Sequence, residues 1–88
     1  MKYSICVTVY NSEDVVDDFL SPLINTEYEI IVVDGMSTDR TPELLSKYQD
    51  RVKIIEQKCS RGLGRKIAIG NSTGDIIIIV DFDTDFLN

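Results

Sequence analysis

The sequence predicts an α/β fold in which a small, mainly parallel sheet is covered by helices on both faces. Short runs rich in Val and Ile recur along the chain, and a polar loop follows each of them. Segments with apolar residues at helical spacing lie between these runs. Strands that alternate with helices form βαβ units, and such units build the parallel sheets of doubly wound nucleotide-binding folds.

The first half of the chain predicts two strands and one helix. Residues 3–9 (YSICVTV) are apolar on both faces and predict a central strand. Residues 12–24 carry apolar side chains at helical spacing, with acidic residues in the first turn and Pro22 near the end. Residues 29–33 (EIIVV) predict a second buried strand.

The second half predicts two further helices and two further strands. Thr-Pro at residues 41–42 is typical of a helix start, and this helix ends near Asp50. Residues 52–56 (VKIIE) predict a third strand, and residues 65–71 predict a short helix after a polar loop. Residues 75–80 contain four consecutive isoleucines and predict a fourth strand, which we expect to be the most buried of the sheet.

Size, charge and cysteine content exclude several classes of protein. A chain of 88 residues has room for one domain with one modest core, and a net charge of −6 argues against nucleic-acid binding. No apolar run approaches the roughly 18 residues that span a bilayer. Cys6 and Cys59 lack metal-ligand spacing, so we expect reduced thiols in a cytoplasmic protein.

Polar side chains follow every predicted strand, at the edge where parallel sheets bind their ligands. These side chains are Thr8, Tyr10 and Asn11 after the first strand, Asp34 after the second, Arg61 and Arg65 after the third, and Asp81 and Asp83 after the fourth. Asp34 is either a turn former or an acceptor for a nucleobase or sugar. The two arginines are either surface charges or partners of a diphosphate, and Gly62 and Gly64 let the backbone approach closely.

Three aspartates at positions 81, 83 and 85 are crowded at the end of the fourth strand. Side chains two residues apart on an extended backbone share a face, so two such carboxylates repel by about 2 kcal/mol. A divalent cation removes this cost, because Mg²⁺ and Mn²⁺ prefer carboxylate oxygens and keep positions open for substrate phosphates. The alternative is a solvated acidic end of the chain.

Four blocks of sequence resemble, in order, the nucleotide-diphospho-sugar glycosyltransferases of family 2, which have the GT-A fold. The blocks are SICVTVYN at 4–11, EIIVVDGMSTDRT at 29–41, RGLGRKIAI at 61–69 and TGDIIIIVDFD at 73–83. The resemblance covers nearly the whole chain. It implies a Rossmann-like three-layer α/β/α half-domain of about four mainly parallel strands in the order 3-2-1-4.

The same resemblance implies a donor site, with a UDP-sugar favoured. The nucleotide- and donor-binding residues would be Thr8, Tyr10, Asn11, Asp34, Arg65 and Asp81. Asp34 would contact the base, Arg65 would lie near the diphosphate, and Asp81 would point to the ribose. Asp81 and Asp83 would form the D-x-D motif of the family, with Asp83 toward a Mn²⁺ or Mg²⁺ ion that bridges the diphosphate.

The chain departs from the family pattern at Gly35, where the V-D-D-G-S pattern has a second aspartate, and it has only three residues after Asp85. The acceptor site and the general base of the family come from a second half. We therefore expect residues 1–88 to form a donor-binding domain without the acceptor-binding half. Such a domain has no catalytic base of its own and binds a donor better than it transfers the sugar.

Three functions stay open. The chain is the donor domain of an inverting glycosyltransferase, a non-catalytic nucleotide-sugar-binding or oligomerising module, or a phosphate-handling hydrolase of the haloacid-dehalogenase kind. The last has its D-x-D-x-T motif after the first strand, whereas here the motif follows the last one. With strand order 3-2-1-4 the fourth strand is a sheet edge, so we also expect a homo-oligomer through that edge or the adjacent helices.

Overall fold

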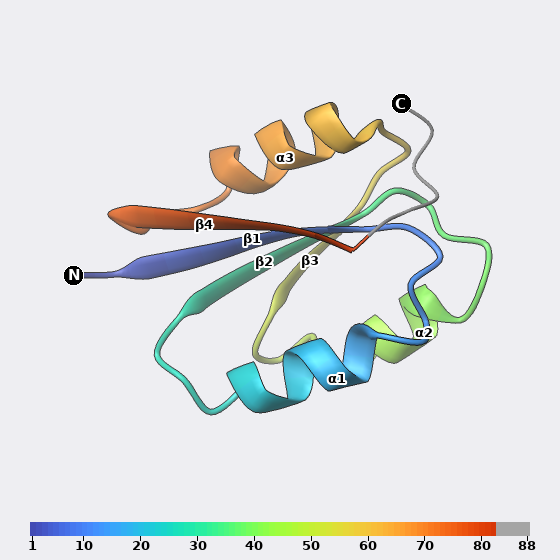
Figure 1. Cartoon of the computed structure of the whole chain (residues 1–88), viewed down its shortest axis with the longest axis horizontal. Coiled ribbons are helices and arrows are strands. Elements are labelled where there is room, and N and C mark those ends of the chain that lie inside the picture. The colour runs from blue at the N-terminus through green and yellow to red at the C-terminus, as the bar shows by residue number, and fades with distance from the viewer. Residues whose placement is uncertain (83–88) are drawn as a thin grey trace.

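The computed structural model describes residues 1–82, and Figure 1 shows how they are arranged. The elements in chain order are β1 (Tyr3–Val9), α1 (Val16–Leu20), η1 (Ser21–Leu23), β2 (Glu29–Asp34), α2 (Thr41–Ser46), β3 (Lys53–Glu56), α3 (Arg61–Gly70) and β4 (Ile76–Phe82), where η1 is one turn of 3₁₀ helix. The predicted alternation of strands and helices is confirmed.

The four strands form one parallel sheet in the order β3-β2-β1-β4, which confirms the predicted fold class and strand order. Since β1 pairs with β2 on one side and with β4 on the other, it is a central strand. In this register Thr8 is the partner of Asp81, and Val9 is the partner of Asp34. The carboxyl ends of β1, β2 and β4 therefore carry their polar side chains at the same edge of the sheet.

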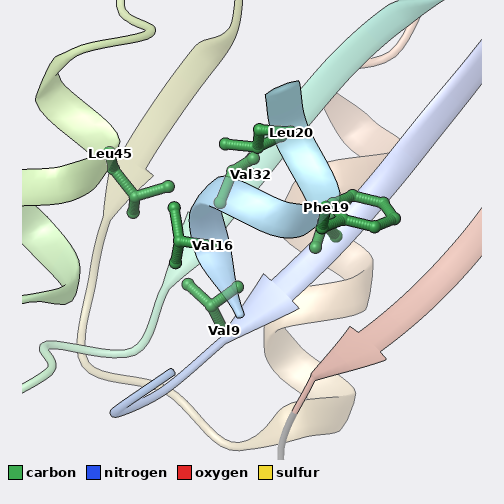
Figure 2. A pocket seen from close by; sticks show the side chains of 7 residues that line it. Val9, Val16, Phe19, Leu20, Val32 and Leu45 are labelled. Carbon is green, nitrogen blue, oxygen red and sulfur yellow. The ribbon is translucent and has the colours of Figure 1, made fainter. Parts of the chain in front are cut away.

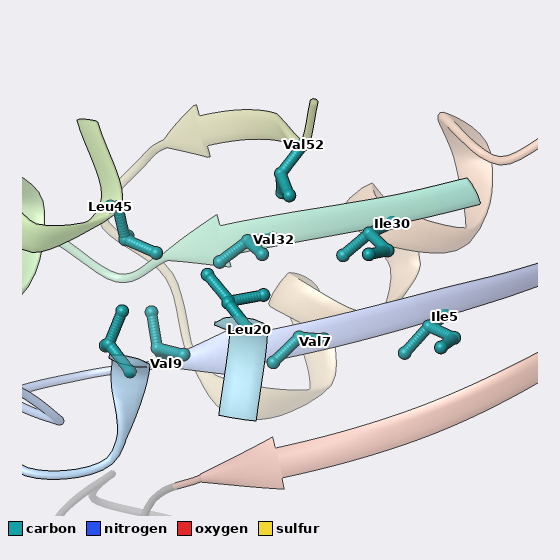
Figure 3. Packing of buried hydrophobic residues seen from close by; sticks show 9 residues of the cluster. Ile5, Val7, Val9, Leu20, Ile30, Val32, Leu45 and Val52 are labelled. Carbon is teal, nitrogen blue, oxygen red and sulfur yellow. The ribbon is translucent and has the colours of Figure 1, made fainter. Parts of the chain in front are cut away.

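Helices cover both faces of the sheet: α1 and α2 lie on one face and α3 lies on the other (Figure 1). The larger core fills the space between the sheet and helices α1 and α2 and consists of Ile5, Val7, Val9, Val16, Leu20, Ile30, Val32, Leu45 and Val52 (Figure 3). The smaller cluster, against α3, consists of Cys6, Ile31, Val33 and Ala68. Side chains alternate along β1 and β2, so each strand supplies both cores.

The first two helices are shorter than predicted. Of residues 12–24, only Val16–Leu20 are α-helical, because a turn precedes them and Pro22 lies in the first turn of η1. Helix α2 ends at Ser46 rather than near Asp50. Thr41 does not cap α2 as its sequence position predicts, since its hydroxyl accepts a hydrogen bond from the Ser12 amide (2.8 Å). No helix within residues 1–82 is long and apolar enough to cross a membrane.

Helix α3 begins four residues before its predicted start. Its N-cap is Ser60, whose hydroxyl accepts a hydrogen bond from the Leu63 amide (3.2 Å) and so satisfies one of the free amides of the first turn. Gly62 and Gly64 are therefore part of the helix and do not belong to a loop. This earlier start brings the first two turns of α3 close to the carboxyl end of β1.

The isoleucine run suggested that β4 is the most buried strand of the sheet. In the structure β4 is instead an exposed edge strand. Among residues 1–82 it pairs with β1 alone, and Ile77, Ile78 and Ile79 are 38%, 41% and 46% exposed. Consecutive side chains of a strand point to opposite faces, so both faces of β4 are incompletely covered. Hydrophobicity predicted the strand correctly, but its place in the sheet depends on which strands pair with it.

A hydrogen-bonded network ties β4 to the amino ends of β1 and β2. Glu29 accepts hydrogen bonds from the Ser4 hydroxyl (2.6 Å) and from the amide and hydroxyl of Thr73 (2.7 and 2.9 Å), and Lys2 lies 3.6 Å away. The Gly74 amide donates to Ser4 (2.8 Å), and a Cβ at Gly74 would lie 2.3 Å from the Ser4 hydroxyl oxygen. We call these five residues the amino-end network.

Candidate functional site

A three-residue cluster joins β1, α3 and β4 at the carboxyl edge of the sheet. The Thr8 hydroxyl donates a hydrogen bond to Asp81 Oδ1. On the same carboxylate, Arg65 Nε lies 3.0 Å from Oδ2 and 3.4 Å from Oδ1, and Arg65 Nη2 donates to Oδ2 as well. The structure thus brings together three of the predicted site residues, which come from three separate elements.

Close packing of α3 on β1 positions Arg65 in this cluster. A Cβ at Gly64 would lie 3.0 Å from Thr8 Cγ2 and 3.4 Å from Cys59 Sγ, whereas a Cβ at Gly62 would have no neighbour within 4 Å. Only a glycine at position 64 allows this approach without displacing Thr8. We expected both glycines to permit a close approach of the backbone, and this close approach occurs at Gly64.

Asp81 is held as a carboxylate by its partners. Burial raises its pKa, but hydrogen bonds from Arg65 and Thr8, together with the charges of Arg65 and Arg61, outweigh this effect and lower the pKa. The same contact raises the pKa of Arg65. The Asp81 side chain is 19% exposed and that of Arg65 is 42% exposed, so the guanidinium still faces solvent on one side. A cation that is partly open to solvent is well placed to meet an anionic ligand.

Asp34 is fully buried at the end of β2, with none of its surface exposed. Its Oδ1 accepts hydrogen bonds from the amide (3.0 Å) and the hydroxyl (2.6 Å) of Ser37. Its Oδ2 has no hydrogen-bond partner among the described residues. Burial raises the pKa of Asp34, and the Ser37 hydrogen bonds only partly oppose this rise. A direct contact with a base, as the sequence analysis expected, requires the covered Oδ2 to become accessible.

Asn11 connects the loop after β1 to the loop after β2. Its backbone is in the left-handed region (φ 49°), which asparagine tolerates better than most residues. Its Oδ1 accepts hydrogen bonds from the amides of Thr38 (2.8 Å) and Asp39 (3.3 Å). Tyr10 lies half-buried in the same loop. Asn11 thus shapes the edge of the site through its contacts with the neighbouring loop.

Sequence reasoning missed the residues that brace these two loops. They are Ser37, Asp39 and Thr41. Ser37 contacts Asp34 and Asn11, and the Thr41 hydroxyl accepts a hydrogen bond from the Ser12 amide. Asp39 accepts hydrogen bonds from the amides of Glu13 (3.2 Å) and Thr41 (2.8 Å). The polar run STDRT at residues 37–41 was the available signal. Short polar side chains of this kind commonly hydrogen-bond nearby backbone groups in loops.

The predicted site residues form two groups with different partners. Thr8 and Asp81 are register partners, and Asp81 contacts Arg65 of α3, whereas Asp34 is the register partner of Val9 and accepts hydrogen bonds from Ser37. Both groups lie at the carboxyl edge. Asp83, the second predicted metal ligand, and Asp85 lie outside the described residues. Within residues 1–82 no three metal-ligating side chains are grouped closely enough to hold an ion.

An apolar hollow of about 10 Å³ lies between α1, α2 and the sheet (Figure 2). Its lining consists of Val7, Val9, Val16, Phe19, Leu20, Val32 and Leu45. A space of this size holds at most one water molecule, and the lining offers no polar side chain. The hollow is a packing defect of the larger core and is unsuited to a polar ligand.

A parallel sheet in the order 3-2-1-4 is typical of nucleotide-binding α/β domains, which bind their ligands at the carboxyl ends of the strands. In this chain the Thr8–Arg65–Asp81 cluster lies at that edge. Residues 4–87 match the family described as glycosyl transferase family 2. The chain belongs to this family, and its structural neighbours are glycosyltransferases with the GT-A fold.

Curated relatives of the chain are named as glycosyltransferases. Poly(ribitol-phosphate) beta-N-acetylglucosaminyltransferase TarS of Staphylococcus aureus is 32% identical over 98 aligned positions, which cover 100% of this chain and 17% of TarS. Poly(ribitol-phosphate) beta-glucosyltransferase of Bacillus spizizenii is 38% identical over 94 positions, which cover 94% of this chain and 15% of the relative. The chain therefore spans about a sixth of the length of these two relatives.

Two solved structures show the same fold with ligands. TarS residues 1–349 in complex with UDP-GlcNAc align with a TM-score of 0.81 at 31% identity, over 92% of this chain and 26% of that one. The mannosyltransferase PcManGT from Pyrobaculum calidifontis, in complex with GDP-Man and Mn²⁺, aligns with a TM-score of 0.78 at 25% identity, over 91% of this chain and 27% of that one.

Proposed function

We propose that the chain is the donor-binding part of a family 2 glycosyltransferase and that it binds a nucleotide-diphospho-sugar, with a UDP-sugar favoured. The nucleotide- and donor-binding residues in this proposal are Thr8, Tyr10, Asn11, Asp34, Arg65 and Asp81. The reaction of the whole enzyme would transfer the sugar to an acceptor hydroxyl with inversion. Residues 1–88 would supply the donor site, and the general base would come from outside them.

The contact between Arg65 and Asp81 is the observation that carries this proposal. It puts a solvent-facing guanidinium at the carboxyl edge of a parallel sheet, where doubly wound folds bind nucleotides. A guanidinium matches a phosphate with two parallel hydrogen bonds. TarS, which resembles the chain over this region, is known in complex with UDP-GlcNAc, and this supports a uridine nucleotide.

Each residue of the cluster has a chemical role in the proposal. Arg65 would donate to the diphosphate and offset its negative charge, because a guanidinium stays protonated at every relevant pH. Asp81, kept ionised by Arg65 and Thr8, would accept hydrogen bonds from the ribose hydroxyls. Thr8 would hold the Asp81 carboxylate in place through its hydrogen bond.

We also propose that Asp81 and Asp83 hold a Mn²⁺ or Mg²⁺ ion. The donor set fits such an ion, because Mg²⁺ sites commonly use one or two carboxylates together with substrate phosphates. The neighbour PcManGT, in complex with GDP-Man and Mn²⁺, supports this choice of ion. The ion would supply positive charge that offsets the diphosphate as it leaves.

Titration calorimetry with UDP and with GDP, each with and without MnCl₂, tests the donor site. We expect UDP to bind and Asp81→Asn to weaken its binding at least tenfold, because hydrogen bonds to a charged partner contribute about 1.5–3 kcal/mol. Asp18→Asn, on the exposed side of α1, is the control. Failure of both nucleotides to bind in any condition would refute the proposal. Binding without donor hydrolysis or transfer would favour the alternative, a non-catalytic nucleotide-sugar-binding module.

The homo-oligomer predicted from the sequence is a separate proposal that concerns β4. Strand β4 presents an unpaired edge with three partly exposed isoleucines, and such edges pair readily with another chain. Sedimentation velocity at increasing concentration measures the association. Ile78→Lys should reduce it, and a wild-type chain that stays monomeric at high concentration would contradict the proposal.

A further inference from the structure

Ser37 joins the loops after β1 and β2 through a single hydroxyl. Its Oγ accepts a hydrogen bond from the Asn11 amide (2.8 Å) and donates one to Asp34 Oδ1 (2.6 Å). Its own amide donates to the same carboxylate oxygen (3.0 Å). The hydroxyl thus links the backbone of one loop to a carboxylate at the end of the neighbouring strand.

The carboxylate at one end of this link is fully buried. Asp34 has no exposed surface, and both hydrogen bonds to its Oδ1 come from Ser37. The other oxygen, Oδ2, has no hydrogen-bond partner among residues 1–82. Ser37 therefore determines the orientation of the Asp34 side chain, and in return the buried Asp34 holds the loop that contains Ser37.

Hydrogen bonds also run from the loop after β2 to the loop after β1. Asn11 Oδ1 accepts from the amides of Thr38 and Asp39, while the Asn11 amide donates to Ser37. Farther along both loops, the Ser12 amide donates a hydrogen bond to the Thr41 hydroxyl. Ser37 holds the inner part of this junction, next to the ends of β1 and β2, so its hydroxyl sets the spacing of the loops where they leave the sheet.

We propose that Ser37 is a positioning residue of the donor site, acting through Asn11 and Asp34 to set the spacing of the two loops that receive the nucleoside. This inference rests on the proposed function and deepens it. The diphosphate would be bound by the Arg65–Asp81 cluster, whereas the hydrogen bonds of Ser37 reach Asn11 and Asp34. Ser37 therefore governs recognition of the base and ribose and has little effect on the phosphates.

The test compares Ser37→Ala and Ser37→Thr with Ser46→Ala as the control. Ser46 also donates a short hydrogen bond (2.6 Å, to the Glu43 carbonyl), but it is exposed on α2 and outside the site. NMR titrations with UDP and with inorganic pyrophosphate, both in the presence of MgCl₂, give the affinities. The backbone amide resonance of Asn11 reports the hydrogen bond to Ser37 directly.

We expect Ser37→Ala to weaken UDP binding about tenfold, to leave pyrophosphate binding within twofold, and to shift the Asn11 amide proton upfield. Ser37→Thr should restore the UDP affinity and the resonance, because it retains the hydroxyl. Ser37→Cys, which keeps the size but weakens both hydrogen bonds, should lie between Ala and wild type, and it replaces Ser37→Ala if that variant does not fold.

Two results would overturn the role of Ser37. Unchanged UDP affinity in Ser37→Ala would show that the loop spacing does not depend on the hydroxyl. Equal losses for UDP and pyrophosphate would show that the hydroxyl supports the whole fold and not the nucleoside loops. A wild-type chain that binds neither ligand would instead refute the donor site, and the role of Ser37 toward the donor would be refuted with it.

Discussion

Arg65 Nε lies 3.0 Å from Asp81 Oδ2, which joins α3 to the end of β4 across 16 positions of the sequence. The other oxygen of Asp81 accepts a hydrogen bond from Thr8 of β1. One carboxylate therefore holds a central strand, an edge strand and a helix at the same point. Substitution of Arg65 should affect ligand binding more than stability, because its side chain is 42% exposed.

Replacing Arg65 tests the charge and the shape of its side chain separately. Arg65→Ala should weaken UDP binding more than tenfold, and Arg65→Lys should recover only part of the loss because an ammonium lacks the planar fork. The free energy of unfolding should fall by less than about 1 kcal/mol, since a partly exposed ion pair contributes little. Calorimetry and chemical denaturation measure both effects. Lys66→Ala, at the next position of α3, is the control and should bind UDP normally.

Replacing Gly64 and Gly62 with alanine should change the free energy of unfolding in opposite directions. A Cβ at Gly64 would press on Thr8 Cγ2 at 3.0 Å, so Gly64→Ala should lower the free energy of unfolding by about 1 kcal/mol after the gain in helix propensity is counted. It should also weaken UDP binding, because α3 carries Arg65. Gly62→Ala meets no neighbour and should stabilise the chain by about 0.5 kcal/mol. Equal effects in chemical denaturation would argue against the close contact of α3 with β1.

Within residues 1–82 two non-glycine residues have positive φ, and changing each to glycine should alter the free energy of unfolding in opposite directions. Met36 (φ 68°) is 52% exposed, so Met36→Gly should relieve backbone strain and raise the free energy of unfolding by up to about 1 kcal/mol. Asn11 (φ 49°) accepts hydrogen bonds from Thr38 and Asp39, so Asn11→Gly should lower it by about 1 kcal/mol. Thermal and chemical denaturation compare the two. Stabilisation by Asn11→Gly would show that its hydrogen bonds contribute little.

Glu29 should make the fold sensitive to acid. Burial raises its pKa, but hydrogen bonds from Ser4 and Thr73 and the charge of Lys2 outweigh this and lower the pKa from 4.5 to about 2. A group whose pKa is lower in the folded state stabilises the fold above its unfolded pKa. This contribution should be complete above about pH 5 and should disappear as the pH falls from 4.5 toward 2.

Glu29→Gln measures this contribution. The variant should be less stable than wild type near pH 7 by about 1 kcal/mol and should lose less stability than wild type between pH 5 and pH 2. Denaturation midpoints over this pH range give the comparison, with the exposed Glu27→Gln as the control. If the stabilities of wild type and Glu29→Gln change in parallel with pH, the amino-end network does not depend on a charged Glu29.

The strands could be predicted from the sequence because Val and Ile runs mark strands and their alternation with helices indicates a parallel sheet. The order of the strands followed only from the resemblance to the family. The helix bounds could not, because they depend on the cap at Ser60 and on a turn of 3₁₀ helix at Pro22. The exposure of β4 depends on which strand lies beside it, which no local pattern records. The predicted donor residues stay predictions, although three of them are in contact.

The structure separates the predicted residues in a way that spacing along the sequence does not reveal. Asp34 and Asp81 both follow apolar strands, but the register pairs Asp34 with Val9 and Asp81 with Thr8. Asp34 is covered and braced by Ser37, whereas Asp81 faces a guanidinium. Whether an aspartate at the end of a strand is buried depends on the conformation of the neighbouring loop. The contact between Ser37 and Asp34 could therefore not be predicted from the sequence.

Met1 is exposed and precedes β1, and the seven residues of that strand run from the amino-end network to the carboxyl edge. Seven extended residues span about 23 Å. A biotin or a surface anchor coupled at Met1 would therefore leave the carboxyl edge facing the solution. Immobilised chains could report nucleotide capture on a sensor chip without steric obstruction from the attachment.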